Sequence, residues 1–144
     1  MKQGIDYVGI TCVFYCHDGK GNLLLHKRSQ KCRDEKDRWD CGGGAMKFGE
    51  TFEQTVRREV QEEYKSKIKK LKFVGINNVI RNNNGAKTHW ITILFAAELD
   101  PKKVKIGVPE KMDKIGWFKP YKLPKPLHSM YLTHLLYVKN AGII

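Results

Sequence analysis

The sequence of 144 residues lacks the features that mark a membrane protein, a secreted protein or a zinc protein. No stretch approaches the roughly 20 apolar residues that a membrane-spanning helix needs, so we expect no contact with a membrane. Residues 1–4 do not begin a secretory signal, and we expect a soluble, cytoplasmic protein. The four cysteines form no Cys-x-x-Cys pair, which favours free thiols over a zinc site; they are Cys12, Cys16, Cys32 and Cys41.

Acidic residues are scarce as well. The chain has 15 Asp and Glu against 27 Lys and Arg, a formal net charge of +12 at pH 7. Such an excess attracts polyanions and favours a phosphate-bearing partner. The basic runs at 65–72 and 102–105 are not interleaved with aromatic residues, as a groove for nucleic acid would require. There are no repeats and no low-complexity linkers, so we expect one domain over residues 1–144.

Against this basic background, acidic residues are concentrated in one segment, residues 50–63. Glu59, Glu62 and Glu63 share a helical sector about 100° wide, where like charges repel. The sector borders an apolar stripe at every fourth position, which places the carboxylates at the rim of a core. A divalent cation would neutralise them, and we interpret the cluster as a magnesium site. The alternative is an ordinary solvated helix face.

The same segment resembles the signature of the Nudix hydrolases. In that signature a glycine is followed after five residues by a glutamate, and after seven more residues by the sequence Arg-Glu-apolar-x-Glu-Glu. The matching positions are Gly44, Glu50, Arg58, Glu59, Val60, Glu62 and Glu63. The family usually continues with a glycine that ends the helix in a left-handed conformation. This chain has Lys65 there, so we expect the end of the helix to differ.

The resemblance implies an α/β (α+β) Nudix fold, a mixed β-sheet sandwiched between α-helices. The residue pattern permits this fold. A helix is expected after Thr51, which would be its N-cap and form a capping box with Gln54. We expect a second helix after Pro126, a charged loop over residues 27–38, and a turn over residues 82–85. Strands are expected at residues 7–15, 23–26, 73–80, 89–98 and 115–118.

The resemblance also implies roles for the acidic residues. Metal ligands would be Glu59, Glu62, Glu63 and the Gly43 carbonyl, with Glu50 in support and Glu110 as a further ligand or base. The metal would be Mg²⁺, with Mn²⁺ as the alternative. Arg58 would orient a catalytic glutamate, and Glu59 or Glu62 would act as the general base.

Substrate contacts are expected from Arg28, from the backbone of Gly42, Gly43 and Gly44, and from Trp117 or Phe118 stacking on a base. A solvent-exposed Arg28 and a core position for one aromatic ring are the alternatives. Nearly the whole chain resembles the MutT-like nucleotide triphosphate pyrophosphatases, which implies release of pyrophosphate from a nucleoside triphosphate. The alternatives are hydrolysis of a nucleotide sugar or an RNA 5′ end, and a Nudix-like module that senses nucleotides without cutting them. The family also implies a homodimer.

Overall fold

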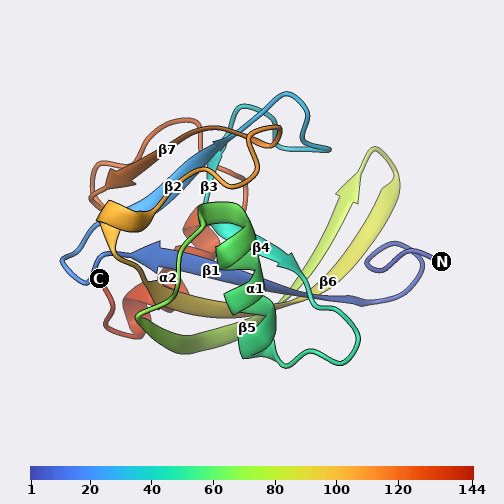
Figure 1. Ribbon diagram of the computed structural model, residues 1–144. Coiled ribbons are helices and arrows are strands. Elements are labelled where there is room, and N and C mark those ends of the chain that lie inside the picture. Colours follow the sequence, from blue (N-terminus) through green and yellow to red (C-terminus); the bar gives the residue numbers. More distant parts are fainter.

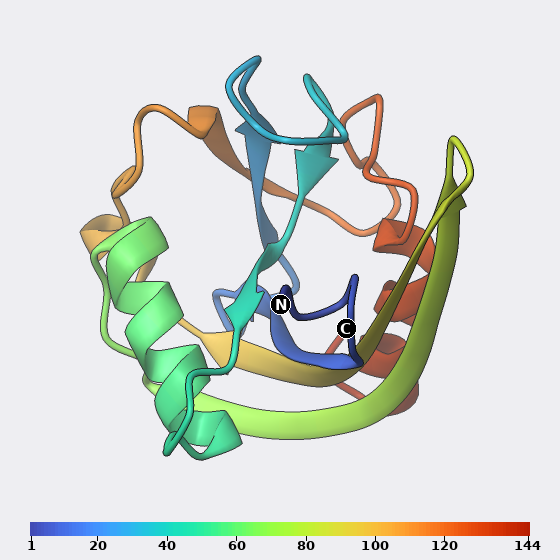
Figure 2. The ribbon, with the colours of Figure 1, turned by 90° about the vertical axis from the view of Figure 1, so that its right-hand side faces the viewer.

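The computed structural model describes the backbone of residues 1–144 and every side chain except that of Asn83. The strands form one mixed sheet, and α1 and α2 lie against its opposite faces (Figures 1 and 2). In chain order the elements are β1 (Gly9–His17), β2 (Leu23–Arg28), β3 (Trp39–Asp40), β4 (Gly42–Ala45), α1 (Phe52–Tyr64), β5 (Lys70–Asn83), β6 (Ala86–Glu98), the 3₁₀ turn η1 (Pro101–Lys103), β7 (Met112–Phe118) and α2 (Tyr131–Asn140). This arrangement confirms the predicted fold class.

Strand β1 runs through the centre of the sheet. It pairs in parallel with β6 and antiparallel with β4. Because side chains alternate along a strand, Phe14 and Cys16 join the core under α1, whereas Tyr15 joins the core under α2. The expected apolar run is therefore a strand buried on both faces. Among the described residues, no helix is long and apolar enough to cross a membrane.

Helix α1 begins as its sequence predicts. The Thr51 hydroxyl accepts a hydrogen bond from the Gln54 backbone N–H, and the Gln54 side chain accepts one from the Thr51 N–H. Val56, Val60 and Tyr64 are fully buried against the sheet. Phe52, predicted to continue this stripe, is 40% exposed because it lies at the first turn of the helix, at the edge of the core.

Several boundaries differ from the prediction. The glycines before the acidic segment form strand β4, which pairs with β1 from Thr11 opposite Ala45 to Phe14 opposite Gly42. A Cβ atom on Gly42 would lie 2.0 Å from the Phe14 ring, so glycine is needed for this close pairing. The β5–β6 hairpin extends further into the expected turn, and β7 begins at Met112. Helix α2 begins only at Tyr131, because a turn from His128 precedes it.

The end of α1 also differs from the expectation. Lys65 adopts the left-handed conformation, with φ at 54°, and its backbone N–H bonds to the Gln61 carbonyl at 3.0 Å. The helix therefore ends with the conformation that glycine usually provides, although a lysine has to adopt it. A left-handed L-residue is strained by about 1 kcal/mol. The strain is local to this cap.

Candidate active site

The carboxylates of α1 are arranged around the guanidinium of Arg58. Its Nε and Nη2 donate to the two oxygens of Glu50, at 2.7 and 2.9 Å. Its Nη1 donates to Glu59 at 2.7 Å and lies 3.4 Å from Glu62, one turn further along the helix. We expected Arg58 to orient one catalytic glutamate, and its guanidinium contacts three. Arg58 supplies part of their counter-charge, because an arginine fork can hold several carboxylates at once.

Glu50 lies outside the helix and contributes to the site through Arg58. Hydrogen bonds from Arg58 lower the pKa of Glu50 to about 2, aided by the Lys47 backbone N–H and the Thr55 hydroxyl. The same bonds raise the pKa of Arg58 above its ordinary value. Both groups therefore stay charged at neutral pH, and the pair fixes the guanidinium relative to Glu59 and Glu62.

Glu63 is different, because it turns inward to the sheet. It accepts a hydrogen bond from the Gly43 backbone N–H at 3.3 Å. Burial raises its pKa well above the ordinary value, and the neighbouring charge of Glu59 raises it further. Glu59 in turn packs against Gly44, where a Cβ atom would lie only 2.2 Å from the carboxyl carbon. The glycine of the signature thus provides space for a carboxylate.

These residues suit a hard divalent cation. A cavity of about 690 Å³ is lined by Glu59, Glu62, Glu63, Gly43 and Glu110 together. Carboxylate and carbonyl oxygens are the donors that Mg²⁺ prefers, and a cation would relieve the repulsion between Glu59 and Glu63. Among the described residues, no three acidic or histidine side chains already converge as a set of metal ligands. The donor chemistry therefore fits a metal, while Arg58 still engages two of the glutamates.

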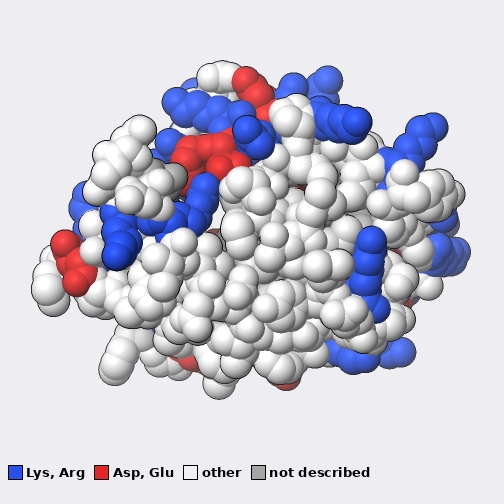
Figure 3. Space-filling view, turned by 180° about the vertical axis from the view of Figure 1, so that it is seen from behind, with Lys and Arg blue, Asp and Glu red and all other residues white. Residues whose placement is uncertain are grey.

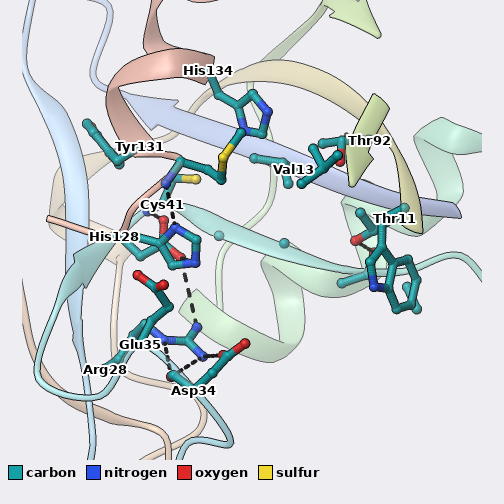
Figure 4. Close-up of a pocket in the computed structure, with 18 of the residues that line it drawn as sticks. Thr11, Val13, Arg28, Asp34, Glu35, Cys41, Thr92, His128, Tyr131 and His134 are labelled. Atoms are coloured by element: carbon teal, nitrogen blue, oxygen red, sulfur yellow. Dashed lines mark hydrogen bonds and ion pairs between the residues drawn. The ribbon is translucent and has the colours of Figure 1, made fainter. Parts of the chain in front are cut away.

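A second and larger cavity, of about 950 Å³, adjoins the acidic one. It lies between the sheet and α2, and Figure 4 shows residues of β1, of the β2–β3 loop and of α2 facing it. His26, Arg28, Gly43 and Glu63 line both cavities. A ligand in the larger cavity could therefore place one end beside the carboxylates, and Gly42 and Gly44 also line it as expected.

Arg28 lies where the two cavities meet. Its guanidinium donates to the Asp34 carbonyl and carboxylate at 3.0 Å and lies 3.8 Å from Asp40. Its side chain is 21% exposed, so it is neither a free surface arginine nor a buried one.

Two buried groups beside Arg28 have shifted pKa values. Burial raises the pKa of Asp40, and burial together with the charge of Arg28 lowers the pKa of His26 to about 3. His26 is therefore neutral and holds the Tyr64 hydroxyl at 2.6 Å.

The predicted aromatic contacts are not at the site. Trp117 packs into the core under α1, and Phe118 packs into the core under α2 against the Trp39 ring. Neither lines either cavity. The indole that does line the larger cavity is Trp90, with Thr88 and Thr92 on the same face of β6. These three residues alternate along the sequence, and this spacing was the available signal that their side chains share one face of a strand.

Sequence reasoning also missed the residues that border the larger cavity on its other side. Glu35 accepts hydrogen bonds from the Ser129 N–H at 2.8 Å and from Arg81 at 2.9 Å. It thereby joins the β2–β3 loop to β5 and to the segment before α2. His128 and His134 line the same cavity. No motif marks these residues, because they meet only when distant segments come together.

Charge is distributed unevenly over this end of the molecule. Figure 3 shows acidic side chains set among Lys and Arg side chains along the top of the view. In Figure 1 that end carries the β2–β3 loop and the segment before β7. Basic residues in the β2–β3 loop, such as Arg33 and Arg38, flank the acidic Asp34 and Glu35. Charges of both signs therefore lie side by side at this end of the molecule.

The sheet flanked by two helices, and the acidic helix facing a cavity, define a Nudix-type domain. The family model described as the NUDIX domain matches residues 7–136, so the chain belongs to this family. This confirms the prediction of a Nudix hydrolase that rested on residues 44–63. Members of the family generally use divalent metal ions and act on nucleotides or other diphosphate compounds.

Known proteins of two kinds are similar to this chain. The NAD-capped RNA hydrolase NudC of Erwinia tasmaniensis is 33% identical over 113 residues, 78% of this chain and 40% of the relative. The protein of the same name from Pectobacterium carotovorum is 34% identical over 82 residues, 57% of this chain and 29% of the relative. The chain thus spans less than half the length of these relatives. The MutT NUDIX hydrolase of Burkholderia pseudomallei superposes with a TM-score of 0.81 at 25% identity, over 92% of this chain and 99% of that one.

Proposed function

We propose that the protein is a Mg²⁺-dependent hydrolase of a phosphoanhydride bond, and that it converts a nucleoside triphosphate to a monophosphate and pyrophosphate. One observation carries this proposal. The carboxylates of Glu59, Glu62 and Glu63 line a cavity that opens beside a second one large enough for a nucleoside. A phosphate chain lying between the two cavities would have Arg28 on one side and the acidic helix on the other.

We propose a role for each of these residues. Glu59, Glu62, Glu63 and the Gly43 carbonyl would hold Mg²⁺, with Mn²⁺ as the alternative. Such a cation shields the phosphate oxygens and acidifies a bound water. Glu59 or Glu62 takes a proton from the attacking water, whose oxygen bonds to phosphorus as the bridging P–O bond breaks and pyrophosphate leaves. Arg58 orients these glutamates.

The other predicted residues support the site from its edges. Glu50 holds Arg58 in place. Glu110, across the acidic cavity, is a further ligand or base. Arg28 would release Asp34 and bind a phosphate, because a guanidinium suits both anions equally. The backbone of Gly42 and Gly44 would lie close to the phosphate chain.

A second candidate substrate is an RNA 5′ end that carries a nucleotide cap. Two observations favour it, the NAD-capped RNA hydrolases among the relatives and the net charge of +12. Basic side chains near the cavities would attract the RNA beyond its cap, and the attraction would weaken with salt. The bond that breaks is again a phosphoanhydride, so the same carboxylates would act on it.

The test is a turnover assay with nucleoside triphosphates, nucleotide sugars and NAD-capped RNA, each with Mg²⁺ and with excess chelator. Nucleoside monophosphate and pyrophosphate, formed only with Mg²⁺, would support the first proposal. Faster cleavage of the capped RNA would select the second candidate, and a sugar phosphate would indicate a nucleotide-sugar substrate. Tight nucleotide binding without product would contradict catalysis and favour a sensor.

Two further expectations belong to the proposal. We propose a cytoplasmic location, which fractionation of the producing cells would test, and a homodimer, which light scattering of the purified protein would test. A monomer at assay concentrations would refute the homodimer without affecting the catalytic proposal.

A further inference from the structure

The residue that follows strand β2 is bonded to the loop that precedes β7. The Ser29 backbone N–H donates to the Lys111 carbonyl at 3.0 Å, and the Ser29 hydroxyl donates to the Glu110 carbonyl. The Cys32 thiol donates to the Lys111 carbonyl at 3.3 Å. Ser29 is only 6% exposed. The turn after β2 therefore binds two consecutive backbone carbonyls, those of Glu110 and Lys111, in the loop before β7.

An irregularity in the sheet brings these segments together. The pairing of β2 with β7 shifts in register between Lys27 and Arg28, so that Arg28 lies opposite Met112. A bulge bends its strand and redirects side chains, and bulges often lie beside active sites. Here the shift comes at the end of β2, directly before Arg28, whose side chain lines both cavities, and Ser29, whose hydroxyl donates to the Glu110 carbonyl.

Glu110 belongs to the segment that Ser29 holds. The segment from Val104 to Lys111 contains no helix and no strand, so no regular element orients the Glu110 side chain. Yet Glu110 lines the acidic cavity together with Glu59, Glu62 and Glu63. Backbone bonds hold the loop at other points, where the Lys111 N–H donates to the Val108 carbonyl at 3.0 Å and the Gly107 N–H to the Glu63 carbonyl at 2.8 Å. Ser29 makes the contact at Glu110 itself.

We propose that Ser29 is a positioning residue, which fixes the loop backbone so that the Glu110 carboxylate faces the glutamates of α1. The inference rests on the proposed function, because it assigns Glu110 a part in that reaction. Ser29 itself lines neither cavity. Its loss would leave the Glu110 carbonyl without its donor and allow the carboxylate to drift, which costs rate more than binding.

The test is a double-mutant cycle of Ser29→Ala and Glu110→Gln, with kcat and KM measured for the best substrate of the panel. We expect Ser29→Ala to lower kcat between about tenfold and about a hundredfold, with KM within about twofold. In the Glu110→Gln background, Ser29→Ala should lower kcat no further, because its effect passes through Glu110. Effects that multiply in the double variant would overturn the inference, as would an unchanged kcat in Ser29→Ala.

Two controls separate positioning from general stability. Ser29→Thr keeps the hydroxyl and should restore most of kcat. Ser66→Ala removes another buried serine, 5% exposed, whose hydroxyl donates to a backbone carbonyl, that of Lys67, at 3.2 Å. Ser66→Ala should lower the melting temperature without lowering kcat. An equal loss of kcat in Ser66→Ala would overturn the inference.

A readout without substrate separates this inference from the proposed function. Amide hydrogen exchange over residues 108–112 should be faster in Ser29→Ala than in the wild type or in Ser66→Ala, because the loop has lost an anchor. Unchanged exchange would overturn the inference whatever the assay shows. If the wild type cleaves nothing in the panel while exchange responds as expected, the proposed function fails and the anchoring by Ser29 is supported.

Discussion

Arg58 and Glu50 form a two-pronged ion pair, with guanidinium nitrogens 2.7 and 2.9 Å from the two carboxylate oxygens. The pair connects the loop before α1 to the face of the helix that carries Glu59 and Glu62. Arg58 also donates to the Ala45 carbonyl at 3.2 Å, which joins the helix to strand β4. The Arg58 side chain thus joins helix α1, the loop before it and strand β4.

We predict that Arg58→Lys lowers kcat by about tenfold to a hundredfold, because an ammonium group cannot hold Glu50 by two bonds and also reach Glu59. Steady-state kinetics of pyrophosphate release would measure this. Arg57→Lys is the matched control, since Arg57 is the neighbouring helix arginine and is exposed. If both variants lost activity equally, the special place of Arg58 would be refuted.

Gly44→Ala should reduce turnover about tenfold or more, because its Cβ atom would displace the Glu59 carboxyl group 2.2 Å away. Such overpacking also costs stability, about 1–3 kcal/mol, which urea unfolding would measure. Gly21→Asn serves as a control, since Gly21 has open space around it and asparagine tolerates its positive φ. Full activity in Gly44→Ala would mean that Glu59 need not occupy its present position.

Lys65→Gly should stabilise the protein by about 0.5–1 kcal/mol, because glycine adopts the left-handed cap without strain. Chemical denaturation would show a higher midpoint, with turnover unchanged. Lys67→Gly, at an exposed position without positive φ, should give no gain. A loss of stability in Lys65→Gly would show that the lysine side chain contributes more than its backbone strain costs.

The free energy of unfolding should decrease as the pH is lowered below about 6.5, because of His26. Burial, followed by the charge of Arg28, lowers the pKa of His26 in the folded state from 6.5 to about 3. Between these values the unfolded chain binds a proton that the folded chain does not, so lowering the pH favours unfolding by up to about 1.4 kcal/mol per pH unit.

His26→Gln, which can still bond the Tyr64 hydroxyl, should make the free energy of unfolding less dependent on pH between pH 6.5 and 4. Urea titrations at a series of pH values would measure the slopes. An identical slope in wild type and variant would contradict the neutral, buried state of His26.

The local parts of the structure were the predictable ones. The Thr51 cap, the buried face of α1 and the strand expected at residues 7–15 follow from neighbouring residues, and each was confirmed. Strand β4 was missed because three glycines carry no strand signal; its pairing with β1 depends on the Phe14 ring lying against Gly42.

The site was predictable where its residues are close in sequence. Glu59, Glu62 and Glu63 lie on one helix, so their spacing alone predicted that they share a face. The larger cavity was not predictable, because Glu35, Arg81 and Ser129 come from three separate segments. Trp117 or Phe118 was expected to stack on a base, with a core position as the alternative; the two side chains of β7 pack against the two cores.

The most direct test of the metal site compares Glu62→Gln with Glu53→Gln, an exposed glutamate on the first turn of the same helix. Turnover would be measured over a Mg²⁺ titration, and Mn²⁺ affinity by water-proton relaxation. We predict that Glu62→Gln remains folded, loses turnover by at least about a hundredfold and binds Mn²⁺ more weakly, while Glu53→Gln behaves as wild type. Unchanged turnover and unchanged Mn²⁺ affinity in Glu62→Gln would contradict it.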